Sequence, residues 1–390
     1  MRNTDYFLGY ERPDGSVGVR NYVALIPSVG CANEVALQIS HLIRGTVALT
    51  HHQGCLIPPR DLAQVSRVLI GLGKNPNVAS CLIVSLGCES VDPDKIADEI
   101  ARTGKPVEII KIYEEGGSIK AIAKGAEKAA KMVSEASRLN RKSFDVKELI
   151  LSTKCGASDT TSGISSNLVV GAVADKIVEK GGTFIFGEVC DIMGGEEILA
   201  KRAVNEEVGK QIIDLVRRFN KLGTLLGVDL VGSQLTAGNV AGGLTTVVEK
   251  ALGANAKSGK KQIKGVLEYG ERPKDKGLYV MNTPGHGFEN LTGVASAGSQ
   301  LMLFTTGLGA PEGHPILPVI KVCGNRNTCN RLAAHIDVDV TGVIDGTESI
   351  EEAAERLYRM ALEVASGRLT KAEILRYDET MEILIYGPVI

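Results

Sequence analysis

Five of the eight cysteines follow short apolar runs that predict β-strands, close to where each strand ends. Each has a glycine or an acidic residue nearby, and they are Cys31, Cys55, Cys88, Cys155 and Cys190. In an open parallel sheet, ligands bind beyond the carboxyl ends of the strands. A single buried cysteine is usually a packing residue, but thiolates beside imidazoles and carboxylates suit iron or zinc. The set as a whole predicts a metal or iron–sulfur site.

A second polar segment, residues 154–163, lies at a predicted strand-to-helix turn. It contains Lys154 and, among small and polar residues, Ser158, Asp159 and Ser162. Free backbone N–H groups at the start of the following helix can hold a carboxylate or a similar anion, and Lys154 adds a positive charge. The alternative is an ordinary helix cap, in which the polar side chains accept hydrogen bonds from the helix start. The residues alone leave both interpretations open.

A third segment, residues 239–246, is a Gly/Thr loop that opens another predicted helix. Its Gly243, Thr245 and Thr246 could bind an anion or the hydroxyl groups of a substrate. The loop lacks the spacing of glycines followed by Lys-Ser/Thr that holds nucleotide phosphates. Nucleotide binding is therefore disfavoured.

Strands and helices that alternate along the chain must position these segments. Apolar runs predict strands at 22–27, 46–50, 80–86, 107–112, 148–153 and 183–187, and amphipathic stretches between them predict helices. This rhythm predicts an α/β fold with two Rossmann-like blocks of parallel sheet. We expect an N-terminal domain at 1–140 and a C-terminal domain at 147–390, with a polar linker over 137–147. The Gly- and Thr-rich region 224–330 is expected to be irregular and to form the site, and Met381–Tyr386 is expected to be a strand.

Composition excludes several classes of protein. The 390 residues are 44% hydrophobic and carry a net charge of −2 with no basic stripe, so we expect no nucleic-acid partner. No apolar run is long enough for a transmembrane helix, and the N-terminus is too polar for a signal peptide. We therefore expect no membrane association and a cytoplasmic protein whose cysteines are free thiols.

Taken together, these motifs resemble the altronate/galactarate dehydratase family, which also includes the large subunit of sulfolactate sulfo-lyase. The matching residues run in family order over nearly the whole chain: Gly9–Gly15 with Gly18–Asn21, His51 with Gly54 and Cys55, Gly87–Glu89, Lys154–Gly156 with Ser158, Asp159, Ser162 and Gly163, Gly242–Thr246 with Glu249 and Lys250, and Phe304–Gly307.

The resemblance implies loss of water from a sugar acid to give a 2-keto-3-deoxy acid, with iron or another divalent metal. Single-chain members carry a small N-terminal domain before the segment that begins here at Gly9. We therefore expect a small partner subunit that supplies this domain, and a homo-oligomer. Three positions depart from the family pattern: Ala157 replaces a usual glycine, Leu168 follows Asn167 where a proline is common, and Leu308 stands where an arginine is common. The lost arginine removes a bidentate carboxylate partner, which puts the substrate class in doubt.

The expected activity is a metal-dependent lyase that eliminates water, or else sulfite, from a small hydroxy acid to give a keto acid. Such a reaction needs a base for the acidic proton and a Lewis or general acid for the leaving group. We expect iron, as Fe²⁺ or an iron–sulfur cluster, held by Cys55, Cys88 and Cys155. The residues expected to act as base or acid are His51, Glu89, Lys154 and Glu188. A zinc hydrolase and a non-catalytic metal-binding subunit are the alternatives.

Overall fold

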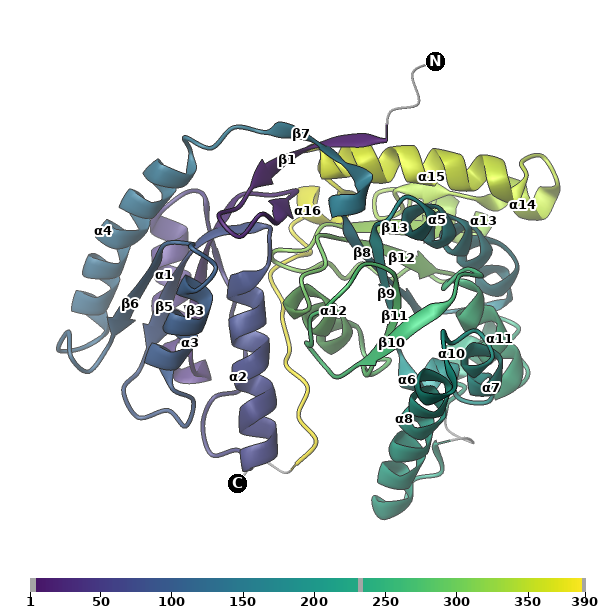
Figure 1. Cartoon of the computed structure of the whole chain (residues 1–390), viewed down its shortest axis with the longest axis horizontal. Helices are drawn as coiled ribbons and strands as arrows, with labels where there is room; N and C mark the ends of the chain where they lie inside the picture. The colour runs from purple at the N-terminus through teal and green to yellow at the C-terminus, as the bar shows by residue number, and fades with distance from the viewer. Residues whose placement is uncertain (1–4, 231–233, 388–390) are drawn as a thin grey trace.

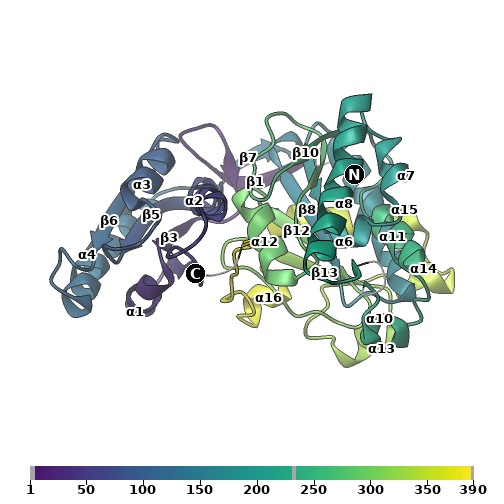
Figure 2. The ribbon, with the colours of Figure 1, turned by 90° about the horizontal axis from the view of Figure 1, so that it is seen from below.

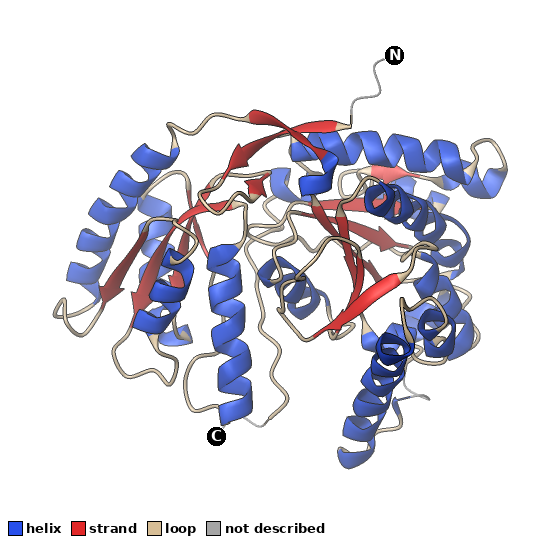
Figure 3. Cartoon of the chain, in the orientation of Figure 1, coloured by secondary structure: helices blue, strands red, loops and turns tan. Residues whose placement is uncertain are grey.

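The computed structural model describes residues 5–230 and 234–387. Its N-terminal part is built on a four-stranded parallel sheet with the strand order β4-β3-β5-β6. The strands are β3 (Tyr22–Pro27), β4 (Thr46–Ala48), β5 (Val78–Ser85) and β6 (Val107–Lys111). Helices α1 (Asn33–Leu42) and α4 (Ser118–Ala136) cover one face, and α2 (Pro59–Lys74) and α3 (Pro93–Ala101) cover the other (Figures 1 and 3).

The central strand β5 shows why this part folds as a covered parallel sheet. All of its residues are buried, and neighbours such as Leu82 and Ile83 join the hydrophobic clusters on opposite faces. Alternate side chains of a strand point to opposite faces, so a strand covered on both sides reads as a continuous apolar run.

The C-terminal part contains a seven-stranded parallel sheet with the order β10-β11-β9-β8-β12-β13-β14. Its strands are β8 (Ile150–Gly156), β9 (Thr183–Phe186), β10 (Ile263–Leu267), β11 (Leu278–Met281), β12 (Leu301–Thr306), β13 (Val319–Cys323) and β14 (Val338–Asp339). One face packs against α5 (Asn167–Glu179), α8 (Glu206–Leu225) and α15 (Ile350–Ala365). The other face packs against α12 (Gly287–Ser296), which in turn packs against α2. The two large sheets therefore share one hydrophobic cluster through α2 and α12, as Figure 2 shows from below.

A small antiparallel sheet joins the two parts, with the order β2-β1-β7. It consists of β1 (Tyr6–Glu11), β2 (Val17–Gly18) and β7 (Lys142–Asp145). The stretch predicted to be a plain linker thus contains a strand. This strand has no recognisable alternation of apolar residues in the sequence, because Phe144 alone packs toward the core, where it contacts Phe7.

The remaining elements are short helices near the carboxyl ends of the large sheet and at the C-terminus. They are α6 (Val189–Ile192), α7 (Glu196–Ala200), α10 (Ala237–Ala241), α11 (Val247–Ala256), α13 (Arg326–Arg331), α14 (Thr341–Asp345) and α16 (Lys371–Ile374). The α/β prediction is confirmed, but the region 224–330 is not irregular throughout, because it supplies β10 to β13 and α12. None of the helices in the described ranges is both long and apolar enough to cross a lipid bilayer.

The tail Met381–Tyr386 is not a strand, contrary to the prediction. It runs in extended form beside α2 (Figure 1), and Met381 and Ile383 are buried in the shared cluster. Asp61 of α2 accepts hydrogen bonds from the backbone N–H of Tyr386 at 3.0 Å and of the next residue at 2.8 Å. A helix side chain satisfies these N–H groups where a neighbouring strand would otherwise do so.

Candidate active site

The large sheet has its topological switch point between β8 and β12. From β8 the chain builds β9, β10 and β11 on one side and then returns to place β12, β13 and β14 on the other. Ligands of open α/β sheets usually bind outside the carboxyl ends of strands at such a point. Cys155 and Thr305 pair across these two strands close to their carboxyl ends. The segment 154–163 therefore lies where a ligand site is expected.

Cys155, Glu188 and Asp191 form a buried group of possible metal ligands. The Cys155 sulfur and one oxygen of each carboxylate lie within 4.8 Å of one another. The backbone N–H of Cys155 donates to Glu188 Oε2 at 2.8 Å, and its thiol donates to Asp191 Oδ2 at 3.3 Å. Glu188 Oε1 is buried and accepts no hydrogen bond. A thiolate with two carboxylates suits iron or zinc, and the open Glu188 oxygen could serve as one ligand.

Two buried lysines contact this group. Lys257 Nζ donates to Cys155 Sγ at 3.0 Å and forms an ion pair with Glu188 Oε2. Lys154 Nζ lies 3.3 Å from Glu188 Oε1 and 4.6 Å from the centre of the Phe304 ring. Because Lys257 stands between two of the possible ligands, a metal ion and Lys257 compete for the same atoms.

A third lysine, Lys250 of α11, lies between this group and a pocket. Its Nζ pairs with Asp191 Oδ1 at 3.0 Å and donates to the carbonyl of Gln234 at 3.0 Å. Three lysine side chains thus face two buried carboxylates, and the carboxylates of Asp159 and Glu249 line the adjoining pocket. The lysines favour an anionic ligand at the buried group.

Burial and charge set the protonation states here. Burial, reinforced by the charge of Glu188, raises the pKa of the Cys155 thiol to about 12. Burial disfavours the Lys257 ammonium, but the negative charges of Cys155, Glu188 and Asp191 outweigh this and raise its pKa. For Asp191, burial is likewise outweighed, and Lys250 and Lys257 lower its pKa. At neutral pH and without a metal, the group therefore holds a neutral Cys155 thiol and a charged Lys250 and Lys257.

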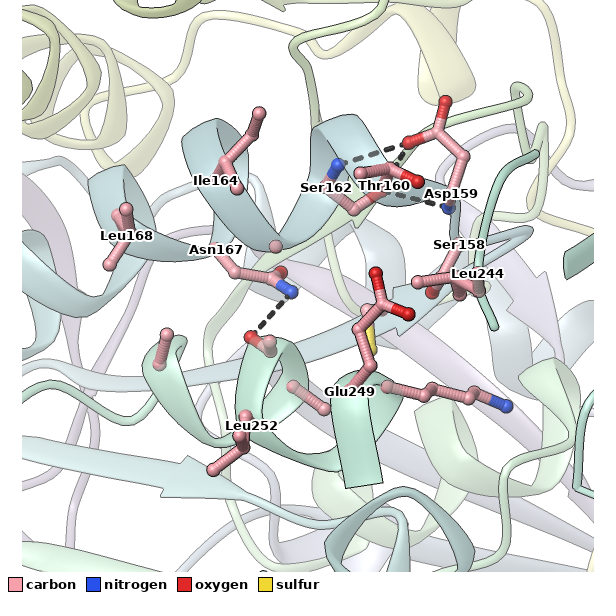
Figure 4. Close-up of a pocket in the computed structure, with 16 residues that line it drawn as sticks. Ser158, Asp159, Thr160, Ser162, Ile164, Asn167, Leu168, Leu244, Glu249 and Leu252 are labelled. Atoms are coloured by element: carbon pink, nitrogen blue, oxygen red, sulfur yellow. Dashed lines mark hydrogen bonds between the residues drawn. The ribbon is translucent and has the colours of Figure 1, made fainter. Parts of the chain in front are cut away.

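A pocket of about 280 Å³ opens beside Cys155. One side is formed by the turn and helix start after β8, including Ser158, Asp159 and Ser162, and the other by α11 with Glu249 and Lys250. Figure 4 shows Ser158 and Asp159 across the pocket from Glu249. The pocket is large enough for a molecule of a few heavy atoms.

The carboxylate of Asp159 organises the turn that lines this pocket. Its Oδ1 accepts from the backbone N–H of Ser162 at 3.0 Å and from the hydroxyls of Thr161 and Ser162. Its Oδ2 accepts from Asn325 Nδ2 at 2.7 Å. Asp159 is therefore a helix cap, as in the alternative interpretation of this segment. The helix continues through a π-helical turn, Ser162–Ser166, a geometry that is frequent at functional sites.

The Gly/Thr loop lies against this turn, and most of its polar groups form hydrogen bonds within the protein. Thr160 N–H donates to the Gly242 carbonyl at 3.0 Å, and a Cβ on Gly243 would lie 2.6 Å from the Thr160 hydroxyl. Thr245 donates its hydroxyl to Glu249, and Thr246 caps α11 by accepting from the backbone of Glu249. The loop therefore fixes the shape of the pocket through its own hydrogen bonds.

Two non-glycine residues at this site have left-handed backbone conformations. Ala157, at the usual glycine position of the family motif, has φ of +50°, and Glu188 has φ of +68°. The turn at Ala157 directs its carbonyl to the backbone N–H groups of Gly307 and Leu308 at the end of β12. Strain of this kind concentrates at functional sites.

The structure does not bring Cys55 and Cys88 to Cys155. Cys155 ends a strand of the seven-stranded sheet, whereas Cys55 and Cys88 lie in loops after β4 and β5 of the other sheet. Among described residues, the groups with ligand atoms within 4.8 Å of one another include neither of them. The reason is that both sheets present cysteines at their carboxyl ends, and the sequence does not reveal whether the carboxyl ends of the two predicted sheets meet in one site. Cys88 Sγ lies 3.7 Å from the hydroxyl of Tyr113.

His51 and Glu89 also belong to the smaller sheet. His51 is buried, its Nε2 contacts the Pro27 carbonyl at 2.7 Å, and its Nδ1 accepts from the backbone of Gln53 at 3.1 Å. Burial lowers the pKa of His51 to about 4, so its ring is neutral and fully engaged with the backbone. Glu89 accepts from Ser28 Oγ and from the backbone of Gly87. Neither residue lines the pocket beside Cys155. Lys154 and Glu188 do not line it either, but Glu188 accepts from the backbone of Cys155 and pairs with Lys154.

The sequence analysis missed Asp191, Lys250 and Lys257 as site residues. Asp191 directly follows Cys190, and Lys250 follows the Gly242–Thr246 motif together with Glu249, so the sequence offers a signal for both. Lys257 lies in a stretch of small and basic residues without any motif. A second group of possible ligands, His286, Glu289 and Glu382, lies nearer the surface at the start of α12.

Comparison with known proteins agrees with this arrangement. Residues 146–386 match the family described as D-galactarate/altronate dehydratase, C-terminal, and residues 9–137 match the second domain of D-galactarate dehydratase/altronate hydrolase. The chain is 42% identical to (2R)-sulfolactate sulfo-lyase subunit beta of Chromohalobacter salexigens, over 97% of both chains. It is 31% identical to altronate dehydratase of Bacillus subtilis, covering 94% of this chain and 75% of the relative. With galactarate dehydratase of Escherichia coli, identity is 32%, covering 93% and 73%. The chain is a lyase that belongs to the D-galactarate/altronate dehydratase family.

Proposed function

We propose that the chain eliminates sulfite or water from a small anionic hydroxy acid, in a metal-dependent reaction at the pocket beside Cys155. The observation that carries the proposal is the buried group of Cys155, Glu188 and Asp191 with its three lysines, at the switch point of the large sheet. The family relationship favours this reaction over the zinc hydrolase and the non-catalytic subunit.

The charge of the site supports an elimination next to a carboxylate. Removal of the acidic proton creates an enediolate, and fixed positive charge stabilises it. Lys257 stays protonated and is suited to this electrostatic role. Lys154 lies 3.3 Å from Glu188 Oε1. Lys154 would be the base where Glu188 holds the metal, and Glu188 would be the base where it does not.

The donor set fits iron, and the ligands would be Cys155, Glu188 and Asp191. A bound metal would supply Lewis acidity for the substrate's carboxylate and leaving group. The thiol must lose its proton to bind a metal, and a nearby cation favours that loss. Ser158 at the pocket wall is placed to donate a hydrogen bond to a substrate oxygen.

The first substrate to test is a sulfonated hydroxy acid, because the relative at 42% identity is named for (2R)-sulfolactate and matches over 97% of its length. A dianion of this kind also suits the three lysines of the buried group. The experiment is to incubate anaerobically purified protein and ferrous iron with a panel of sulfonated, aldonic and aldaric hydroxy acids. We expect sulfite and a keto acid from the sulfonated member. Keto acid from aldonates or aldarates alone would instead assign a dehydratase.

A small partner subunit forms part of this proposal, since the same relative is named as a subunit beta. We expect turnover only after a small chain of the subunit alpha type is added. Full activity of the isolated chain, unchanged by that addition, would contradict this part. A cytoplasmic location and a homo-oligomer stay predictions. The eight free thiols suit a reducing compartment.

A further inference from the structure

The smaller sheet carries its own set of cysteines, apart from the pocket beside Cys155. Its topological switch point lies between β3 and β5, because the chain places β4 on one side of β3 and β6 on the far side of β5. Cys31 follows β3 and Cys88 follows β5, so both lie where an open α/β sheet usually binds a ligand. Cys55 lies in the loop after β4.

The three loops that carry these cysteines are hydrogen-bonded to one another. Gly30 N–H donates to the Gln53 carbonyl at 3.0 Å, which joins the first loop to the second. Ser90 N–H donates to the Gly54 carbonyl at 2.9 Å, which joins the second to the third. Ser28 Oγ donates to Glu89, which joins the first to the third. In each of these three hydrogen bonds, both residues lie within three positions of Cys31, Cys55 or Cys88.

Glycines permit this close approach of the loops. A Cβ on Gly54, which has φ of +112°, would lie 2.3 Å from the Ser28 carbonyl oxygen. A Cβ on Gly87, which has φ of +122°, would lie 2.8 Å from the ring of Tyr113. The Tyr113 ring in turn lies against Cys88. The backbone at these positions therefore holds the cysteine-bearing loops together instead of leaving them as independent surface turns.

Two of the three thiols are open to solvent. Cys31 and Cys88 are exposed, and Cys55 is half-buried against the hydrophobic cluster of the smaller sheet, whereas the other five cysteines of the chain are buried. Burial in the core, the usual reason for an unpaired cysteine, therefore does not explain Cys31 and Cys88. An exposed thiol at a loop held by other loops is available as a ligand.

We propose that Cys31, Cys55 and Cys88 bind an iron–sulfur cluster at the carboxyl end of the smaller sheet. This site is separate from the Cys155 group of the proposed function. Its three thiolates leave one iron without a cysteine ligand, so that iron is open to a small oxygen ligand or to a partner subunit.

The three sulfurs do not lie close enough together to bind one metal ion. Around one tetrahedral ion, metal–sulfur bonds of about 2.3 Å would place the sulfurs within about 4 Å of one another. Among described residues, these three cysteines do not form a group with all ligand atoms within 4.8 Å. In a cluster each cysteine binds a different iron, so the sulfurs lie farther apart.

The experiment uses the full chain, purified without oxygen and reconstituted with iron and sulfide. Beyond the iron bound at the Cys155 group, we expect iron and acid-labile sulfide in equal amounts. We also expect the visible absorption of an iron–sulfur chromophore. The variants Cys31→Ser, Cys55→Ser and Cys88→Ser should each lose that absorption. The control variants Cys155→Ser and Cys81→Ala should keep it, although Cys155→Ser should lose turnover.

A measurement on the unmodified chain covers the case in which a variant fails to fold. Protein reconstituted with iron and sulfide and protein without them are treated with an alkylating reagent. The modified cysteines are then mapped by mass spectrometry. Loading should protect Cys31, Cys55 and Cys88 together. Equal labelling of the three in both samples, iron without sulfide, or a chromophore lost only in Cys155→Ser would overturn the proposal. These readouts do not depend on turnover, so they separate it from failure of the proposed function.

Discussion

The side-chain nitrogen of Lys257 lies 3.0 Å from the sulfur of Cys155, although 102 positions separate the two residues in the chain. The same nitrogen forms an ion pair with Glu188, which is also fully buried. Lys257 is thus the cation that compensates a buried carboxylate and a polarisable sulfur at the same time. Its removal affects both stability and metal binding.

The first prediction concerns the stability that this pair contributes. Lys257→Met should lower the free energy of unfolding by about 3 kcal/mol, because Glu188 keeps its charge and loses one of its two lysines. Adding Glu188→Gln should restore part of the loss. The control Lys261→Met, at a half-exposed ion pair with Glu179, should change stability by less than about 0.5 kcal/mol. Urea unfolding of the four proteins measures this, and equal losses in the single and double variants would contradict it.

The second prediction concerns iron at the Cys155 group. Cys155→Ser should weaken iron binding by more than about 10-fold, because the softest ligand is lost. Lys257→Met should bind iron at least as tightly as the unmodified chain, because a competing ammonium is gone. Anaerobic titration with metal analysis measures both, and Cys329→Ser is the control. Unchanged affinity in Cys155→Ser would show that the metal binds elsewhere.

The third prediction concerns the substrate anion. Leu308 occupies the position where relatives often carry an arginine, so we expect the turn at 154–163 to hold the substrate's carboxylate instead. Ser158→Ala should lower kcat/KM roughly tenfold or more, as a lost hydrogen bond to a charged group costs about 1.5–3 kcal/mol. Its melting curve should not change. Ser134→Ala on the exposed side of α4 is the control, and equal kinetics in both variants would place the anion elsewhere.

The fourth prediction concerns backbone strain at Ala157. Ala157→Gly should raise the free energy of unfolding by about 1 kcal/mol, because glycine adopts φ of +50° without strain. The same change at Ala123, an exposed position within α4, should lower it by about 1 kcal/mol. Thermal or urea unfolding gives both values. Destabilisation by the same amount at the two positions would show that Ala157 is not strained.

The fifth prediction concerns pH. Burial lowers the pKa of His51 to about 4, whereas the unfolded chain binds that proton near pH 6.5. The unfolded state therefore takes up the proton first as the pH falls, and stability decreases between about pH 6.5 and 4. From pH 7 to 5 this amounts to about 2 kcal/mol.

A comparison of variants isolates the contribution of His51 to the pH dependence of stability. In His51→Asn, the loss of stability between pH 7 and 5 should be smaller by about that amount, as measured by urea unfolding at each pH. The exposed His41→Asn should keep the pH dependence of the unmodified chain. An identical slope in His51→Asn would mean that the ring is protonated in the folded protein.

The sequence by itself determined many of the segments that become strands and helices. The strand Tyr22–Pro27 and the helix Ser118–Ala136 have the bounds that the sequence predicts, because apolar periodicity over neighbouring residues is a local property. The sequence also predicted Lys154, Cys155 and Glu188 as site residues, since the end of a parallel strand is recognisable from the chain alone. The structure brings these three residues together. In the same way, it indicated the family through motifs that keep their order.

The tertiary structure decided which strand ends face one another. The order of strands in a sheet depends on how distant helices pack, and no local pattern records it. The sequence predicts Cys88 and Cys155 at strand ends of two separate blocks, and only the packing of the two sheets decides that they do not belong to one group of ligands. Lys257 had no motif around it, and only packing of α11 against α6 brings it to Cys155 and Glu188. Local periodicity thus fixes the elements, and long-range packing fixes the site.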